Sequence, residues 1–544
     1  MPWAQVYDPL NAPWLSTLLA ALPIVVLLGG LAFLKLKAHV AALSGLMASF
    51  LISILAFRMP ADKTFLSTVL GAVYGLFPIG WIILNAIFLY ELCLDRGAIQ
   101  VLRENMASVT SDRRLQLLLI AFCFGAFFES AAGFGTPVAI TASLLIGLGF
   151  PPLQASGLSL IANTAPVAYG ALGTPIVALA GVTGLDLHLL SAMVGRQLPF
   201  FSILIPFWLI AVFCGWRKML EVWPAALVAG LSFAVPQALI SNFHGPWLAG
   251  VVSSLVSLAA LIILLRLWRP KRIYSPESFG PAEMKEKNLN NRALFQTAAP
   301  WLILSLVIFI WGIPQFKKLL DTIFSPSLAV PGLHQQVLRM PPVSPAPAAE
   351  AAVFRFNFLS FTGTGILVAA LLSGFMMRFS PKRMLTIYGK TLKRVRFSLL
   401  TVSAMLALGY ITRYSGMDAT LGLAFARTGV LYPFFGTLLG WLGVALTGSD
   451  TSSNVLFGSL QKITAEQLGL SPVLMAAANS SGGVMGKMID AQSIVVASTA
   501  TRWYGHEGRI LRFVFWHSLI LAALVALLVF LQAYIYPFSR LVVR

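Results

Sequence analysis

Two acidic residues stand alone inside long apolar stretches of this sequence, Glu129 in its first half and Asp450 in its second. An ionised carboxylate is costly to bury, so burial favours the protonated form and suits a group that exchanges a proton. The alternative is a structural acid paired with a cation, for which Lys487, Arg196 and Arg413 are candidates. Because ionisable residues at membrane depth are mostly functional, we expect both acids to be proton-coupling groups.

The residues around the two acids are small or carry hydroxyl and amide groups, which predicts interrupted helices. Ser, Thr, Asp and Asn cap the free N–H groups of a helix start, where the backbone carries about half a positive charge. Such a start can hold a small carboxylate without a buried arginine. The predicted substrate-binding residues are Gly133, Gly135, Thr136, Asn163, Thr164, Ser449, Thr451, Ser452, Ser453, Asn454, Asn479 and Lys487.

Each of these residues also has a simpler interpretation. Small residues such as Gly133 allow helices to pack closely in a membrane. The amides of Asn163 and Asn479 either cap backbone groups or contact a solute or an ion. Lys487 either attracts an anion or pairs with an acid, and Asp490 follows as a group that can neutralise it. For the cluster as a whole, we expect the binding of a small polar solute.

The surroundings of the two acids recur in the same order along the chain. After each acid come a Leu-Gly pair, a proline, and then an asparagine followed by hydroxyl-bearing residues. The two sets are Glu129, Leu148, Gly149, Pro152 and Asn163, and Asp450, Leu468, Gly469, Pro472 and Asn479. This order predicts a duplicated unit. Paired interrupted hydrophobic segments in two halves of a chain indicate the binding site of a secondary transporter.

The composition places the chain in a membrane. Of its 544 residues, 58% are hydrophobic and 10% are charged, whereas a soluble domain has about 25% charged residues. We predict an all-α polytopic membrane protein with about 12–14 transmembrane helices of ~20 residues each. The net charge of +19 fits cytoplasmic loops and anionic lipid heads rather than nucleic acid. The spacing of the three cysteines predicts neither a metal site nor a disulfide framework, and no cofactor is expected.

Basic segments divide the chain. We predict an N-terminal membrane repeat over residues 1–265, a basic cytoplasmic linker over 266–297 and a C-terminal membrane repeat over 298–544. A further basic segment, 378–396, is expected as a loop between spans on the cytoplasmic side. The Pro-rich connection 317–355 then lies outside in an extended form, together with the N-terminus.

Longer strings carry a resemblance to a known family. They include residues 123–127, 131–135, 163–168, 194–200, 446–454 and 492–494. On these strings, almost end to end, the chain resembles the lactate permease family. The resemblance implies uptake of L-lactate with protons across the bacterial inner membrane, with D-lactate and glycolate as further substrates. It also implies two inverted repeats with re-entrant or broken helices. The chain departs from the family pattern at Ser130, Thr136 and Asp490-Ala491, beside the predicted site.

We therefore predict a multi-pass carrier of the bacterial inner membrane that takes up small 2-hydroxymonocarboxylates, lactate and glycolate among them, by proton symport. Its expected partners are the monocarboxylate, protons and the lipid bilayer, without nucleic acid or metal. A sodium-coupled carboxylate carrier is the alternative within transport, because Asn163, Asn479 and broken-helix carbonyls can ligate sodium. A membrane enzyme or a subunit of a proton-pumping complex is the alternative of another class, although the sequence lacks a nucleophile–histidine pairing.

Overall fold

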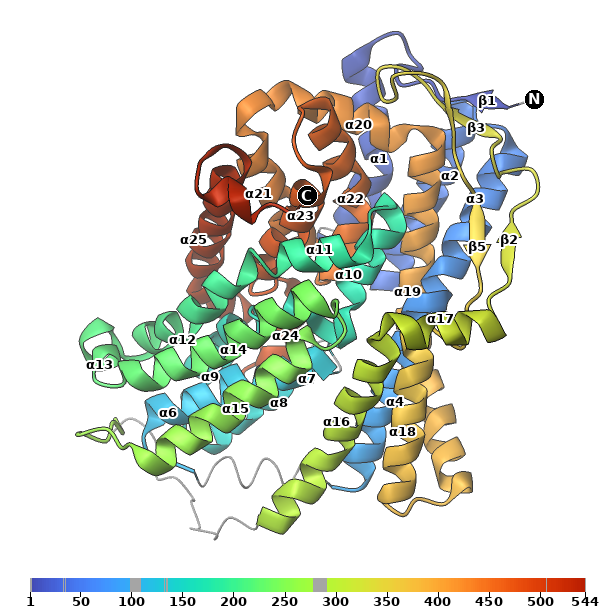
Figure 1. The fold of residues 1–544 in the computed structure, drawn as a ribbon. Helices are drawn as coiled ribbons and strands as arrows, with labels where there is room; N and C mark the ends of the chain where they lie inside the picture. The colour runs from blue at the N-terminus through green and yellow to red at the C-terminus, as the bar shows by residue number, and fades with distance from the viewer. Residues whose placement is uncertain are drawn as a thin grey trace.

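The computed structural model describes residues 2–32, 34, 36–97, 109–131, 133, 136–276, 291–504 and 506–543. The side chains of residues 31, 32, 136, 291–298, 314 and 491 also lie outside this description. Helices make up most of the molecule, and they run through it in several tilted layers (Figure 1). The linker predicted over 266–297 falls partly on residues 277–290, which lie outside the described residues.

In the first half of the chain, the described residues form one short strand, fourteen α-helices and three irregular helical turns. They are β1 (Trp3–Ala4), α1 (Pro13–Ala32), α2 (Ala38–Leu55), α3 (Ala61–Tyr74), η1 (Gly75–Gly80), α4 (Trp81–Asp95), α6 (Arg113–Leu117), η2 (Leu118–Phe124), α7 (Gly125–Ala131), α8 (Thr136–Gly147), α9 (Pro152–Ala162), η3 (Val167–Tyr169), α10 (Gly170–Thr183), α11 (Leu187–Val194), α12 (Leu198–Cys214), α13 (Trp216–Leu220), α14 (Trp223–Phe243) and α15 (Ala249–Leu267). Proline stands in the first turn of α9, α12 and α14, where its missing N–H costs nothing.

The second half continues with helices and four short strands. They are α16 (Asn291–Gly312), α17 (Pro314–Ile323), β2 (Ser327–Ala329), β3 (Val337–Arg339), β4 (Ala348–Ala349), β5 (Val353–Arg355), α18 (Thr362–Met376), α19 (Pro381–Ser415), α20 (Met417–Phe425), η4 (Ala426–Leu431), α21 (Tyr432–Thr447), α22 (Asp450–Gln467), α23 (Pro472–Gly486), α24 (Ala491–Ala500), α25 (Glu507–Tyr534) and η5 (Phe538–Leu541). Helix α21 ends at Gly448, whose φ of 73° is a left-handed conformation that suits glycine.

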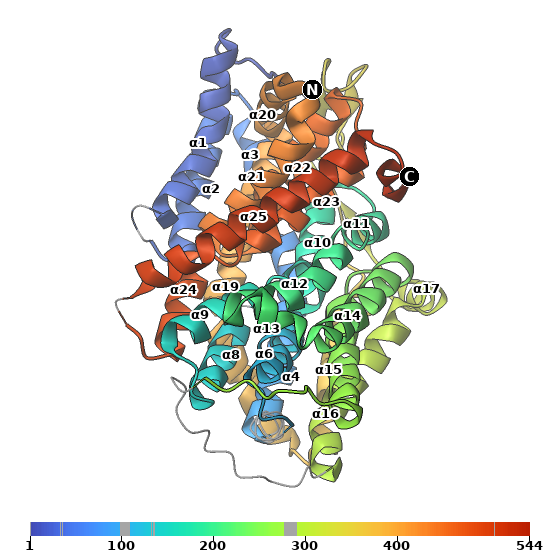
Figure 2. The ribbon, with the colours of Figure 1, turned by 90° about the vertical axis from the view of Figure 1, so that its left-hand side faces the viewer.

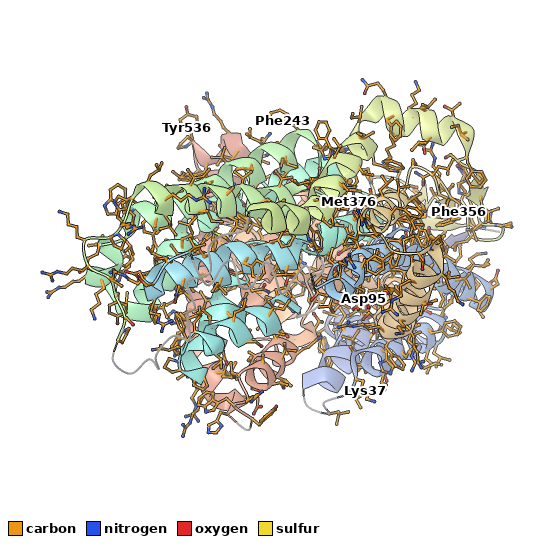
Figure 3. The ribbon with its side chains drawn as sticks, turned by 90° about the horizontal axis from the view of Figure 1, so that it is seen from below. Lys37, Asp95, Phe243, Phe356, Met376 and Tyr536 are labelled. Atoms are coloured by element: carbon orange, nitrogen blue, oxygen red, sulfur yellow. The ribbon has the colours of Figure 1, made fainter. Side chains whose placement is uncertain are left out.

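The helices confirm the predicted all-α polytopic membrane protein. Within the described residues, 10 helices are long and apolar enough to cross a membrane, or 12 if each of two bent pairs counts as one span. Large apolar side chains face outward, as a lipid environment requires. Phe243 and Tyr536, which are 83% and 67% exposed, lie at the edge of the molecule (Figure 3). The number of spans lies at or below the lower end of the predicted range because several apolar segments form short, broken helices.

The strands tie the N-terminus to the long connection between α17 and α18. Strand β1 pairs in parallel with β3, so that Trp3 lies opposite Val337. Strand β3 also pairs antiparallel with β4, and β2 pairs antiparallel with β5. The N-terminus and the Pro-rich connection therefore lie on the same side of the molecule, as the sequence predicted. The predicted extended form of 317–355 was wrong for residues 317–323, which belong to α17, because Pro314 starts this helix and no proline follows within it. The strands lie in the remainder of the connection.

Helix α19 corrects one sequence-based expectation. The basic segment 378–396 is mostly the first part of this 35-residue helix and not a loop. Its buried residues Met384, Ile387, Thr391 and Val395 recur at helical spacing, while the lysines and arginines between them face outward. Arginine and lysine are good helix formers, so a basic stretch need not interrupt a helix. Two of the arginines pair with Glu91 and Asp95 of α4.

The two interrupted units exchange helices. Helix α10, which follows the first acid, packs against α22 in the second half. Helix α24, which follows the second acid, packs against α8 and α9 in the first half, and these three helices lie together in the rotated view (Figure 2). Because each unit completes its packing with an element of the other, the regions around the two acids meet in the interior of the molecule.

Candidate functional site

A cavity of about 200 Å³ lies where the two interrupted units meet. Seven of the predicted site residues line it: Glu129, Gly133, Ser449, Asp450, Thr451, Ser452 and Lys487. Its remaining wall comes from η3 and α10, from the end of α21, from Gln492 of α24, and from the start of α2 and the middle of α19. The structure thus brings both isolated acids and the predicted cation to one cavity, while their roles stay predictions.

The first turns of three helices form part of the cavity wall. Helix α22 starts beside Ser449, whose hydroxyl accepts the N–H of Ser452 at 3.3 Å. Helix α24 starts at Asp490, whose carboxylate accepts the N–H of Ser493 at 2.7 Å. Helix α10 is broken over residues 171–173, which have positive φ, and its regular part starts beside the cavity. Helix starts carry partial positive charge, so together they favour an anion in this space.

Among the described residues, Asn163 is the side-chain donor to Glu129. Glu129 lies on α7 and is 4% exposed. The amide of Asn163, at the end of α9, donates from Nδ2 to its Oε2 at 3.0 Å. The other carboxylate oxygen lies close to glycine backbone, because a Cβ added to Gly170 would stand 3.0 Å from Oε1. A glycine at this position leaves the space that the carboxylate occupies.

Asp450 has a different set of partners. It is the first residue of α22 and is 3% exposed. The hydroxyl of Ser480 donates to its Oδ2 at 2.5 Å, and Nδ2 of Asn454 donates to the same oxygen at 3.5 Å. Its Oδ1 has no hydrogen-bond partner among the described residues. A Cβ on Gly483 would stand 2.5 Å from that oxygen, so a glycine is needed there as well.

The predicted asparagines of the second half form a packing network behind the cavity. Asn479 donates from Nδ2 to Asn454 Oδ1 at 2.9 Å, and its own Oδ1 accepts from Gln461 Nε2 at 3.2 Å. Asn454 also donates to the carbonyl of Pro175 at 3.2 Å, which joins α22 to α10. Asn479 therefore differs from Asn163, its counterpart in the sequence, because it contacts amides and not the acid.

Lys487 is the cation of the site. It is 6% exposed, and its Nζ donates to the carbonyl of Gly448 at 2.6 Å. The carboxylate of Asp490 lies 3.3 Å from the same Nζ, so the expected pairing of these two residues is present. The other two candidate cations engage groups elsewhere: Arg196 bonds Asn242 at 2.9 Å, and Arg413 bonds Glu350 at 3.1 Å.

The other predicted site residues occupy less direct positions. Asn163 and Asn454 lie one contact behind the cavity wall, through their bonds to Glu129 and Asp450. Asn479 lies one contact further back, through its bonds to Ser453 and Asn454. The hydroxyl of Ser453 donates to the carbonyl of Gly440. Thr164 is buried just after the end of α9 and donates to the carbonyl of Ile161 in that helix at 2.9 Å. Gly135 lies outside the described residues, and so does the side chain of Thr136, whose backbone begins α8.

Several lining residues were not among the predicted ones. Gly170 and Thr174 belong to a stretch in which glycines and a proline interrupt the apolar sequence. This interruption could have identified them as site residues. Gln492 stands next to the helix start at Asp490. His39 and Thr401 come from α2 and α19, and nothing in their local sequence marks them. Their place in the wall depends on how distant helices pack.

Comparison with known proteins gives a consistent result along the whole chain. A family model described as L-lactate permease matches residues 16–536. The chain is similar to the glycolate permease GlcA of Escherichia coli K12, with 47% identity over 558 residues and 98% of each chain covered. It is similar to the L-lactate permease of Salmonella typhimurium, with 46% identity over 546 residues and 98% of each chain covered. Among solved structures, the Alcanivorax borkumensis YdaH transporter matches with a TM-score of 0.45 and 14% identity, covering 97% of this chain and 98% of that one.

Proposed function

Because this chain belongs to the L-lactate permease family, we propose that it takes up L-lactate, D-lactate, glycolate and similar small 2-hydroxymonocarboxylates together with protons. The family and the apolar helices make it a multi-pass membrane transporter rather than an enzyme. The names of the relatives support lactate and glycolate as substrates. We place the protein in the bacterial inner membrane because its relatives come from bacteria.

The substrate carboxylate binds between the helix starts and Lys487. The first turns of α10, α22 and α24 line the cavity, and each contributes about half a positive charge there. Lys487 adds a full positive charge from a buried position. The hydroxyls of Ser449 and Thr451 provide partners for the 2-hydroxyl group of the substrate. This arrangement of donors is the observation that carries the proposal.

The charges of the site explain why protons accompany the anion. When Glu129, Asp450, Asp490 and Lys487 are all ionised, the site holds three negative charges and one positive charge. An anion entering that cavity meets net repulsion, which is strong where water is excluded. Each proton taken up by Glu129 or Asp450 removes one negative charge. Binding of the monocarboxylate is therefore linked to protonation, which is the thermodynamic requirement for symport.

Asp450 is the better placed of the two acids to carry the coupled proton. The hydroxyl of Ser480 can donate to the ionised carboxylate and can accept from the protonated one. The amide Nδ2 of Asn163 at Glu129 can only donate, so it favours the ionised form. The amide of Asn454 makes the same kind of contact with Asp450, but at 3.5 Å it is the weaker bond. Oδ1 of Asp450, which has no hydrogen-bond partner in the part of the chain that the structure describes, adds to the cost of the charged state, since buried carboxylate oxygens need donors.

The two repeats remain part of this proposal. We place one membrane repeat over 1–265 and the other over 298–544, joined by the linker 266–297. The exchange of α10 and α24 between the two units supports this division, because each unit packs one of its own helices against the other unit. Two interrupted segments that face one cavity also match the general plan of secondary transporters with repeats.

Uptake of labelled lactate by proteoliposomes tests the proposed function. An inward proton gradient should drive lactate above its equilibrium concentration, and glycolate should compete. Sodium at fixed pH should have no effect. A proton ionophore serves as the control, because it removes the gradient without touching the protein. Uptake that follows a sodium gradient and ignores pH would favour the sodium-coupled alternative, and equilibration without accumulation would indicate a passive channel.

A further inference from the structure

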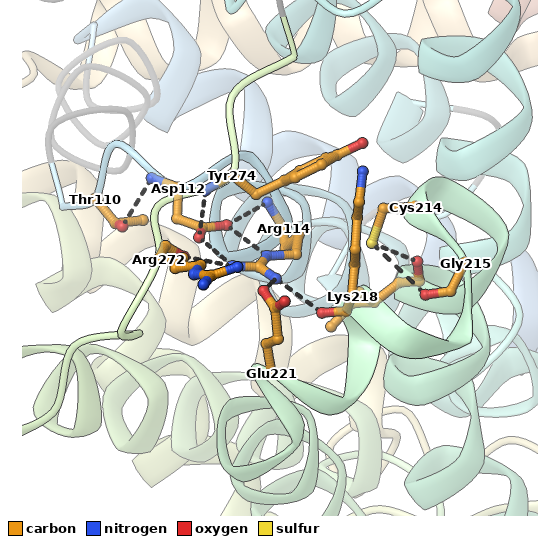
Figure 4. A network of polar contacts seen from close by, with 10 residues as sticks. Thr110, Asp112, Arg114, Cys214, Gly215, Lys218, Glu221, Arg272 and Tyr274 are labelled. Atoms are coloured by element: carbon orange, nitrogen blue, oxygen red, sulfur yellow. Dashed lines mark hydrogen bonds and ion pairs between the residues drawn. The ribbon is translucent and has the colours of Figure 1, made fainter.

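A buried guanidinium away from the cavity holds two distant basic segments together (Figure 4). Arg114 is fully buried and forms ion pairs with Asp112 at 2.8 Å and Glu221 at 2.7 Å. Its remaining N–H groups donate to the carbonyl oxygens of Lys218 and Arg272, each at 2.8 Å. One side chain thus fixes α13 next to the segment that follows α15.

Asp112 and Tyr274 complete this connection. The carboxylate of Asp112 accepts the N–H of Tyr274 at 3.0 Å, and the N–H of Arg113 donates to the Tyr274 carbonyl at 3.0 Å. The ammonium of Lys218 lies 4.4 Å from the centre of the Tyr274 ring, a favourable cation–π position. The backbone of both segments is therefore held in one geometry, and their outer side chains form a continuous surface.

This surface carries a concentration of positive charge. Its exposed basic residues, which we call the basic patch, are Arg217, Lys218, Arg266, Arg269, Lys271 and Arg272. The acids of the network, Asp112 and Glu221, are both paired with Arg114 underneath. They are thus already engaged, and the outward positive charge remains available to an anionic partner.

Exposed aromatic and aliphatic side chains stand beside the basic patch. Trp216 is 62% exposed, Leu220 is 59% exposed and Trp223 is 50% exposed. The patch also lies at one edge of the membrane, because α12 ends, α14 begins and α15 ends beside it, and all three belong to apolar spans. Tryptophan and basic residues at a span end are typical of the lipid headgroup region.

We propose that the basic patch binds the phosphate of anionic phospholipids in the adjoining leaflet, with Trp216 and Leu220 inserted among the upper acyl carbons. The network around Arg114 pre-forms the surface, so that lipid binding does not have to order it. Each basic residue near an anionic membrane surface strengthens binding by about 1 kcal/mol, or about fivefold in affinity. Several such residues in one fixed surface distinguish anionic from zwitterionic lipid.

Native mass spectrometry of the full-length protein in detergent tests this proposal, with phosphatidylglycerol and phosphatidylcholine as probes. The variant Arg217→Gln/Arg269→Gln/Lys271→Gln keeps Lys218 on Tyr274 and removes three outward charges. It should bind phosphatidylglycerol about a hundredfold more weakly, with phosphatidylcholine binding unchanged. The matched control is Lys318→Gln/Arg427→Gln/Arg540→Gln, three exposed basic residues outside the patch, which should bind phosphatidylglycerol as the parent does.

Three outcomes overturn the proposal. Equal losses in the patch and control variants would mean that only total charge matters. Displacement of the lipid by an equal concentration of inorganic phosphate would mean a site for free anions and not for lipid. If the patch variant does not fold, the parent protein still tests the proposal. Its affinity for phosphatidylglycerol must weaken as the salt concentration rises from about 50 to about 300 mM. Binding that ignores salt would contradict the proposal.

Discussion

The two acids lie in one cavity but in unlike surroundings. Glu129 accepts a hydrogen bond from the amide of Asn163, whereas Asp450 accepts one from the hydroxyl of Ser480. In the sequence, Asn163 corresponds to Asn479. However, Asn479 donates to the amide oxygen of Asn454, and the next residue, Ser480, donates to Asp450. A duplicated sequence pattern has thus produced two different sites.

The difference between the partners of the two acids indicates that the two halves have different roles. An amide that only donates stabilises a fixed negative charge, while a hydroxyl accommodates both states of an acid. The second half also supplies the buried ion pair of Lys487 and Asp490. We infer that the first half shapes the cavity and sets its field, and that the second half carries the proton and holds the anion. Four measurements, taken from the largest expected effect to the smallest, test this comparison.

Removing the cation of the second half should have the largest effect. Lys487→Gln leaves Asp490 buried without its partner and should destabilise the protein by about 3–5 kcal/mol. The double variant Lys487→Gln/Asp490→Asn should recover most of that stability but keep a KM for lactate raised about tenfold, because the anion has lost its cation. Thermal unfolding in detergent and uptake kinetics separate the two effects. A double variant with the parent KM would show that Lys487 only neutralises Asp490.

Neutralising the two acids should have unequal effects on coupling. Asp450→Asn should reduce proton-driven accumulation by about a hundredfold, and Glu129→Gln by about tenfold, because coupling free energies are usually about 1–3 kcal/mol. Accumulation in proteoliposomes under an imposed pH gradient measures both, and Asp62→Asn, an exposed acid, is the control. Equal losses would remove the distinction between the halves, and parent-like accumulation in both variants would remove the mechanism.

The glycines beside the two acids should also differ. A Cβ on Gly483 would stand 2.5 Å from Asp450 Oδ1 and 2.9 Å from Val444 Cγ2, whereas one on Gly170 would stand 3.0 Å from Glu129 Oε1. Overpacking costs about 1–3 kcal/mol, so Gly483→Ala should approach the upper end and Gly170→Ala the lower. Unfolding midpoints of the two variants give the order. Gly181→Ala, which meets nothing within 4 Å, is the control.

The two corresponding asparagines should show the smallest but most specific contrast. Asn163→Ala removes the donor of Glu129, and Asn479→Ala opens the amide network behind Asp450. Each should cost about 1–2 kcal/mol of stability, as lost buried hydrogen bonds do. Only Asn163→Ala should also shift the pH dependence of lactate uptake, since only Asn163 bonds an acid. A shift of similar size in Asn479→Ala would contradict the asymmetry.

The sequence pointed to several of the residues that line the cavity. Glu129, Asp450, Ser449 and Lys487 are all at the cavity, because a polar group in an apolar segment must face a polar space or a partner. It could not predict His39 or Thr401, because no sequence motif near either residue indicates a binding site. It was also wrong about the basic loop before the second half of α19, because charge alone does not determine whether a segment is helical.

The amino-acid sequence by itself determined that this protein lies in a membrane, that its helices break near two acids and that those acids would be buried. These properties follow from local composition and from residues that start or stop helices. The tertiary structure alone decided which donor meets which carboxylate, so that Asp450 meets a hydroxyl and a longer amide contact, while Glu129 meets an amide. The reason is that such contacts depend on the rotation and packing of distant helices, and small differences there exchange one neighbouring side chain for the next.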